Sequence, residues 1–450
     1  MAAEFSMTRV TAFWGRLNSS FWFVPTVMAV VAVSLSFLLI EVDVLRGVQE
    51  TKDPGAIYTF GPEGSRAILS VIASSMITVA SLSFSITMLS LQLASSQFGP
   101  RVIGNFMSDR SNQVVLGTFI ATFLYCLSVL RSVRGTEGAS FVPHLAVAFG
   151  VLLAVASVAV LIYFIHHIAT LIRVETMLAN LANEGCVAVD RLFPERIGHA
   201  PDGDRDETDL YRLPDDFDAG SRPIAADSGG YVQNIGTDVV MQIATEQDLV
   251  LRIDAPPGQF VTKGVCVITA YPRDRVSDEI EEDLRGAVVI GRDRTPHQDL
   301  EFAIRRIVEL AQRALSPGIN DPTTALYCID RLGEVLGRLA GRTFPASLRL
   351  DQNGRLRIAT EVVFLEGVTC RAFAAIARYG ITDADVVTRL VETLAKLETS
   401  VPFAARPVIA EFRHQVLSAS LGPGIQGFDR KILADLQDTA RNGPGSKAAG

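Results

Sequence analysis

Long apolar segments alternate with short polar connections over the first 172 residues. Four of these segments are apolar over enough residues to cross a bilayer, at positions 21–40, 67–93, 114–130 and 141–172. Glu41 and Asp43 follow the first one, where a cleaved signal peptide would have small residues. Because the helical apolar pattern continues to about Asp190, we predict a four-helix transmembrane domain at 21–193 with an extended fourth helix.

A line of polar residues follows the second apolar segment. This segment has no charged residue between Ala67 and Ser96, yet hydroxyl and amide side chains recur at three-, four- and seven-residue steps. We call them the polar stripe: Ser70, Ser74, Thr78, Ser81, Ser85, Gln92 and Ser96. At 3.6 residues per turn they fall in one narrow sector of a helix. We expect that sector to face other helices or water, because lipid offers it no partner.

Two interpretations of the polar stripe carry about equal weight. Small hydroxyl residues often form close-packing surfaces between membrane helices, and they also line pores. Three features favour a pore: the stripe spans the membrane depth, Gln92 suits close packing poorly, and a break follows it. In that break Gln97 and Arg101 would form a positively charged cytoplasmic mouth. One chain has too few spans to enclose water, so a pore requires a homo-oligomer.

The pattern after the fourth segment predicts a further sequence of regions. Acidic residues dominate 194–221, which has the composition of a flexible linker. Period-two alternation near 249–254 and frequent turn glycines predict a small β-barrel or sandwich at 222–271. Helical periodicity then fills a cytoplasmic helical domain at 272–442. The remaining ends are an N-terminal cytoplasmic arm at 1–20 and a disordered tail at 443–450.

Two helix starts in this helical domain contain a proline. Thr295, Pro296 and Gln298 fit a capping box with proline at the first helical position. The structural motif Asn320, Asp321 and Pro322 opens the next helix. We expect the Asp321 carboxylate to accept a backbone N–H from residue 323 or 324 rather than to bind a ligand.

Short connections arrange the elements of the same domain. The tight stretch 316–320 predicts an antiparallel helix pair, and Asn353-Gly354 predicts a hairpin. Three more helices are expected at about 367–379, 383–399 and 404–420.

Charge and candidate chemistry exclude several classes of protein. The net charge of −8 comes largely from 201–220, and no basic patch with aromatic residues indicates nucleic acid. Five widely spaced cysteines without a CxxC pattern fit a reducing compartment. The adjacent His166 and His167 point about 100° apart on a helix, so we expect an interfacial location rather than a shared metal. For Arg292 and Arg294 we expect ion pairs with the acidic stretch 278–283 in preference to an anion site.

Two phrases carry a resemblance to a known family. They are 91–101, LQLASSQFGPR, and 314–325, ALSPGINDPTTA, with Gly291-Arg292-x-Arg294-Thr295 upstream. Their order and spacing resemble the bacterial predicted-membrane-protein family catalogued as domain of unknown function 2254, from about Phe21 to Leu421. The resemblance implies an inner-membrane protein with a cytoplasmic C-terminal half and no assigned activity. It supplies no catalytic residues.

The sequence therefore predicts four transmembrane helices followed by a cytoplasmic α+β region. We expect a multi-pass protein of the bacterial inner membrane with both termini cytoplasmic, since Lys and Arg modestly favour that orientation. Its expected partners are the bilayer and copies of itself, without a cofactor, metal or nucleic acid. The function we favour is a channel for an ion or small solute that the sequence does not identify. A non-conducting sensor or scaffold is the alternative. An enzyme and a secondary transporter rank lower, because the chain lacks acid–base motifs, intramembrane charges and repeats.

Overall fold

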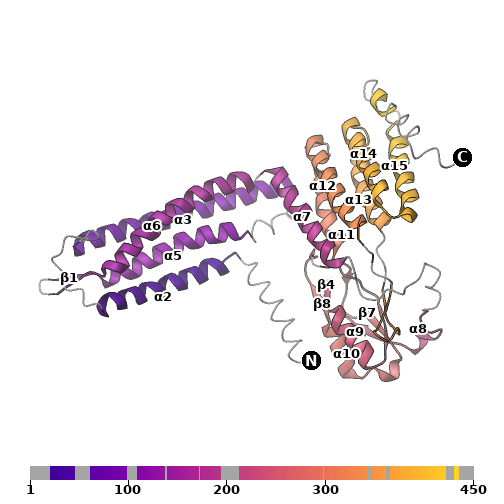
Figure 1. Ribbon diagram of the computed structural model, residues 1–450, viewed down its shortest axis with the longest axis horizontal. Helices are drawn as coiled ribbons and strands as arrows, with labels where there is room; N and C mark the ends of the chain where they lie inside the picture. Colours follow the sequence, from indigo (N-terminus) through magenta and orange to yellow (C-terminus); the bar gives the residue numbers. More distant parts are fainter. Residues whose placement is uncertain are drawn as a thin grey trace. The chain divides into compact units, whose positions relative to one another are not determined.

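The structure is a computed structural model of the 450-residue chain. It describes residues 21–45, 61–98, 109–136, 139–171, 173–193, 212–296, 298–342, 344, 347–360, 365–421 and 430–434. The chain divides into two compact units, Met1–Thr176 and Met177–Gly450 (Figure 1). The N-terminal arm, most of the acidic linker and the C-terminal tail lie outside the described residues.

The first unit is a bundle of long helices, coloured indigo to magenta in Figure 1. They are α2 (Phe23–Leu45), α3 (Pro62–Phe98), α5 (Arg110–Ser132) and α6 (His144–Leu171). Each contains an 18-residue window apolar enough to cross a membrane, which confirms the four spans expected from the sequence. A short hairpin of β1 (Arg134–Thr136) and β2 (Ala139–Phe141) connects α5 to α6.

Helix α5 is the centre of this bundle, because it packs against α2, α3 and α6. Its approach to α2 depends on Gly117: a Cβ atom there would lie 2.6 Å from the Met28 sulfur and 3.2 Å from the Pro25 Cα. Between α5 and α6, the buried Thr122 and Ser157 hydroxyls lie 3.2 Å apart and share a hydrogen bond. Small and hydroxyl residues therefore allow close helix approach on the inside of the bundle.

Side chains from other helices close the ends of two spans. The carboxylate of Asp43 is fully buried at the end of α2 and accepts the backbone N–H groups of Leu145 at 3.1 Å and Ala146 at 3.2 Å. Arg66 of α3 donates to the Val133 carbonyl at 2.8 Å, just beyond the end of α5. Helix ends leave such backbone groups without intrahelical partners, and near lipid they must be satisfied inside the protein.

The fourth span does not continue as one helix. Helix α6 ends at Leu171, and a separate helix α7 (Val174–Leu192) follows the non-helical Arg173. Residues of α7 pack within the second unit, with Leu178, Leu181 and Val189 buried. The expectation of an uninterrupted extended helix was wrong, because the apolar face beyond residue 173 belongs to a different core from the span before it.

Two sheets form the β part of the second unit. One has the strand order β3 (Arg222–Ala225), β7 (Cys266–Tyr271), β5 (Val250–Ile253), β10 (Leu356–Thr360), β9 (Leu348–Leu350). The other has the order β6 (Phe260–Val261), β4 (Gly230–Ile235), β8 (Val288–Gly291). Three short helices accompany them: α8 (Phe217–Gly220), α9 (Thr237–Glu246) and α10 (Asp278–Gly286), together with the 3-10 turn η3 (Arg273–Arg275).

Residues 222–271 are therefore not a separate barrel or sandwich. β5 pairs in parallel with β10, and β4 pairs with β8, so strands from outside this range complete both sheets. A single apolar core draws on both sheets and on α9 and α10, and it includes Leu251, Leu284 and Ile358. Strands with open edges gain hydrogen bonds by recruiting later segments, and local alternation carries no sign of such pairing.

The remaining helices agree with the expected pattern. They are α11 (Leu300–Ala314), α12 (Pro322–Ala340), α13 (Leu365–Gly380), α14 (Ala384–Ser400) and α15 (Arg406–Ser420), with η4 (Phe403–Ala405) before the last. α11 packs on α12 across the tight connection. The predicted hairpin is β9–β10, whose turn contains Gly354 at φ +74°.

Candidate functional site

The polar stripe lies on the outside of the four-helix bundle. Ser70, Ser74, Thr78, Ser81, Ser85, Gln92 and Ser96 are all exposed on α3. At 100° per residue they occupy a sector about 80° wide. The buried residues of α3 are Ser65, Leu69, Ala73, Met76, Ala80, Ser83, Ser90 and Ala94. Their sector is centred about 150° away, so the stripe faces away from the helices of its own chain.

Hydroxyl groups of the stripe are satisfied along the helix itself. Ser74 donates to the Ser70 carbonyl at 2.9 Å, Thr78 to the Ser74 carbonyl at 2.8 Å, and Ser85 to the Ser81 carbonyl at 2.9 Å. The hydrogen of each of these hydroxyls is therefore engaged in a bond within the helix, while the lone pairs of its oxygen can still accept a hydrogen bond from a donor outside the helix. The stripe presents a column of hydrogen-bond acceptors to whatever lies beside α3.

Apolar side chains border the stripe on both sides. Val71, Leu82 and Leu89 are exposed on one flank, and Ile77 and Phe84 on the other. Among the described residues the stripe is exposed, so it is not packed between the spans of its own chain, which was one form of the packing interpretation. Packing against a second copy and contact with water both fit this geometry. The expected mouth is less defined: Gln97 is in the last turn of α3, but its side chain and Arg101 lie outside the described residues.

A polar cluster that the sequence did not indicate joins α5 to α6. Asp109 is the N-cap of α5 and accepts the Ser111 N–H at 3.0 Å, while its other oxygen lies 2.6 Å from His167 Nε2. The Tyr163 ring stacks on the His167 ring with 5.4 Å between centroids, and its hydroxyl donates to Ser111 Oγ at 3.1 Å. His166 is exposed. The spacing Asp-x-Ser signals a helix cap, but nothing local signals a partner 58 residues away.

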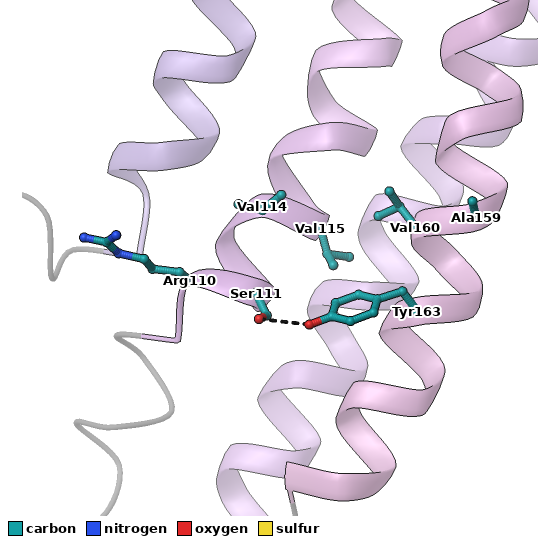
Figure 2. A pocket seen from close by; sticks show the side chains of 7 residues that line it. All are labelled: Arg110, Ser111, Val114, Val115, Ala159, Val160 and Tyr163. Carbon is teal, nitrogen blue, oxygen red and sulfur yellow. Dashed lines mark hydrogen bonds between the residues drawn. The ribbon is translucent and has the colours of Figure 1, made fainter. Parts of the chain in front are cut away.

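An open groove lies beside this cluster. Figure 2 shows its walls, formed by Arg110, Ser111, Val114 and Val115 of α5 and by Ala159, Val160 and Tyr163 of α6. Its volume is about 450 Å³. Val115 is buried, whereas Val114 and Tyr163 are about half exposed, so the groove opens outward between the two spans. Its lining is apolar apart from the end where the hydroxyls of Ser111 and Tyr163 meet.

The Asn320-Asp321-Pro322 motif forms a helix start. Asp321 is the N-cap of α12, and its carboxylate accepts the Thr324 N–H at 3.1 Å and the Thr324 hydroxyl at 2.5 Å. Asn320 has φ +49°, a left-handed conformation that asparagine tolerates better than most residues. Pro322 occupies the first turn, where it loses no hydrogen bond. This geometry is that of a cap and turn.

The start of α11 differs from the expected capping box. The helix begins at Leu300 with Asp299 as its N-cap, and Gln298 instead bonds both the N–H and the carbonyl of Ile235. Arg294 pairs with Asp299 through two hydrogen bonds, of 2.7 and 3.0 Å, and not with the acidic stretch 278–283. The predicted capping box does not form, because Asp299, the residue after Gln298, offers a carboxylate that both caps the helix and binds Arg294.

An ion-pair network holds the β9–β10 hairpin against β5. Arg357 of β10 donates to Asp351 at 2.8 Å and to Asp248 at 2.8 Å, and its side chain is 6% exposed. Asp351 is 2% exposed and also accepts the N–H groups of Asn353 and Arg355. Hydrogen bonds from Arg357 and Arg275 lower the pKa of Asp248 to about 2. The network ties together segments about 100 residues apart in the chain.

Within the described residues, the second unit has no sign of an activated nucleophile or metal centre. Burial raises the pKa of the thiols of Cys186, Cys266, Cys328 and Cys370, so they stay protonated at neutral pH. No group of three or more His, Cys, Asp or Glu side chains is placed to hold a metal ion in the described parts of the chain.

The spans and the α+β unit define a multi-pass membrane protein with a folded region outside its spans. Residues 18–396 match the family described as Predicted membrane protein (DUF2254), and the chain belongs to that family. An uncharacterized protein of Mycobacterium tuberculosis and one of Mycobacterium bovis are each 31% identical to it over 401 residues, covering 88% of this chain and 75% of theirs. No solved structure matches the chain.

Proposed function

We propose that the protein is a channel or channel-like permeation path, formed by several copies with α3 nearest their common axis. The observation that carries this proposal is the position of the polar stripe, opposite the face by which α3 packs on its own chain. Facing lipid, the remaining lone pairs of the Ser74, Thr78 and Ser85 hydroxyls would have no partner. Around an axis, the same column would line a water-filled path.

The rest of the proposal concerns placement in the cell. We place the protein in the bacterial inner membrane with both termini cytoplasmic. The four spans found in the described residues would put both ends on one side, and the modest excess of Lys and Arg in the N-terminal arm favours the cytoplasm. The second unit would then act as a vestibule or regulator. We propose no enzymatic role for it, in keeping with its protonated thiols.

A non-conducting sensor or scaffold is the second candidate. The internal hydrogen bonds of Ser74, Thr78 and Ser85 favour it, because hydroxyls already bonded to the helix can also pack tightly against a neighbouring copy. Both candidates place the stripe at a contact between copies, and only the channel requires water there.

Single cysteines test the position of the stripe. In a background without the native cysteines, Ser74→Cys, Ser81→Cys and Ser85→Cys are compared with Leu82→Cys, which is also exposed but borders the stripe. We expect the stripe positions to react with a charged aqueous thiol reagent, since a thiol in lipid stays protonated and unreactive. Oxidation should also crosslink them between copies. Reaction at Leu82→Cys alone would place the flank of α3, and not the stripe, in water.

Conductance separates the channel from the scaffold. Purified protein in planar bilayers should carry a current that the thiol reagent blocks in the Ser81→Cys variant but not in the Leu82→Cys variant. Arg101→Glu should shift the preference between anions and cations, because a charge repeated around a mouth biases permeant ions. Crosslinking without current at any voltage or membrane tension would favour the scaffold.

A further inference from the structure

The groove between α5 and α6 lies at the start of α5, a helix long and apolar enough to cross a membrane. Arg110 and Ser111 begin α5, whose apolar window qualifies it as a span. At 1.5 Å per residue, Val114 and Val115 lie about 6–8 Å further along the helix. The groove thus has a polar end at the start of this helix and an apolar floor further along it. A phospholipid likewise has a polar headgroup at the membrane surface and apolar acyl chains below it.

Hydrogen bonds join α5 to α6 at one end of the groove. Asp109 links the start of α5 to His167, and Tyr163 is fixed between the His167 ring and the Ser111 hydroxyl. These contacts join the two helices at the polar end, which preserves the gap between Val115 and Ala159. A preformed apolar gap lowers the entropic cost of taking up a chain.

The positive charge of Arg110 at the polar end of the groove favours a lipid with a negatively charged headgroup. Among the described residues Arg110 makes no hydrogen bond or ion pair, and its exposed guanidinium turns outward from the groove end in Figure 2. The neighbouring acid does not neutralise it by contact, because both oxygens of Asp109 are engaged by Ser111 and His167. A guanidinium suits the phosphodiester of a lipid particularly well, with several donors in one plane.

We propose that this groove binds one anionic phospholipid of the leaflet that borders the start of α5. The Arg110 side chain turns toward the phosphodiester, which also accepts a hydrogen bond from the Ser111 hydroxyl, while the Tyr163 hydroxyl continues to donate to Ser111. One acyl chain lies on Val115 between Val114 and Val160. The occupant comes from the bilayer, which surrounds the open side of the groove. The proposal does not depend on conduction, since a scaffold could bind lipid equally well.

Lipid titration of the full-length protein in detergent, followed by native mass spectrometry, tests the site. The probes are dioleoyl phosphatidylglycerol and dioleoyl phosphatidylcholine, which differ in headgroup charge. We expect the anionic phosphatidylglycerol to bind more tightly than the phosphatidylcholine. Arg110→Gln should weaken the binding of phosphatidylglycerol about tenfold, which is the effect of losing one charge-assisted hydrogen bond. The affinity for phosphatidylcholine should stay unchanged. Ala159→Phe should displace both lipids by filling the groove.

Matched variants control for general effects. Arg173→Gln removes an exposed arginine at the same end of the bundle, and Ala156→Phe adds a ring at an exposed position of α6 outside the groove. Both should bind like the unmodified protein. Equal affinity for the two lipids, or equal losses in the matched variants, would overturn the proposal. If Ala159→Phe does not fold, Arg110→Gln and its control decide the matter alone.

Discussion

Arg357→Met is the change that most directly tests how the second unit is held together. Methionine keeps much of the apolar stem of the arginine and removes its donors. The change leaves the buried Asp351 without its arginine and releases Asp248 from one of its two closest cationic partners. β10 is the strand that joins the β9–β10 hairpin to β5, so its pairing should weaken first.

The structure sets the size of this effect. Removing one partner of a buried ion pair costs about 3–5 kcal/mol. Asp351 keeps two backbone N–H donors, and the Asp248 side chain is 49% exposed and can be hydrated. We therefore expect the lower end, about 3 kcal/mol, from the local stability of the β5–β10 pairing. At 1.4 kcal/mol per factor of ten, this is roughly a 100-fold rise in the population of the open state.

Hydrogen–deuterium exchange of the full-length protein in detergent measures this population. Amides of β5 and β10 should exchange roughly 100-fold faster in Arg357→Met. Arg355→Met is the control: it lies two residues away, its side chain is 69% exposed, and it is 3.5 Å from Asp248. Such an exposed pair contributes about 0–1 kcal/mol, so its exchange should change less than about fivefold. Equal exchange in the two variants would show that the buried network does not hold these strands.

Three further predictions follow from the caps, the charges and the helix contacts. Asp321→Ala should destabilise α12 by about 0.5–2 kcal/mol, measured by the urea midpoint in pulse proteolysis, and Asp321→Asn should largely restore it. Loss of function in a fully folded Asp321→Asn protein would instead make the carboxylate a ligand. The folded pKa of Asp248, about 2, lies below its usual value, so its contribution is complete above about pH 4 and is lost as the pH falls toward 2. Pepsin pulse proteolysis should show this acid-dependent loss, and Asp248→Asn should be less sensitive over the same range. Gly117→Ala should lower the thermal stability of the bundle in detergent, since its Cβ would meet Met28 and the backbone at Pro25; unchanged stability would mean that α2 shifts without cost.

Patterns within one segment predicted the fold well. The length and apolar pattern of each segment identified the spans, and Asn353-Gly354 identified a hairpin. Spans and hairpin turns could be predicted because residues close together in the sequence determine them. The cap at Asp321 belongs to the same kind of signal. The capping box predicted at Thr295 does not form, because Gln298 bonds to Ile235 in a distant strand and Asp299 caps the helix instead.

Features that depend on distant partners were out of reach. The parallel pairing of β5 with β10 joins strands separated by α10, α11 and α12, so residues 222–271 looked self-contained. The pair between Asp109 and His167 likewise spans 58 residues. The periodicity of the polar stripe was visible in the sequence, but only packing of α3 on its own chain shows which way the stripe faces.

The contact between Asp43 and the start of α6 has a consequence for biosynthesis. Leu145 follows Asp43 by 102 residues, and chains grow at about 5–20 residues per second, so the carboxylate waits roughly 5–20 s for the backbone groups that bind it. Until then the first span carries an acid at its boundary that no later helix has covered. The last span to be made thus completes the first, and a nascent chain that stalls before α6 would expose an unmatched carboxylate by which membrane quality control could recognise it.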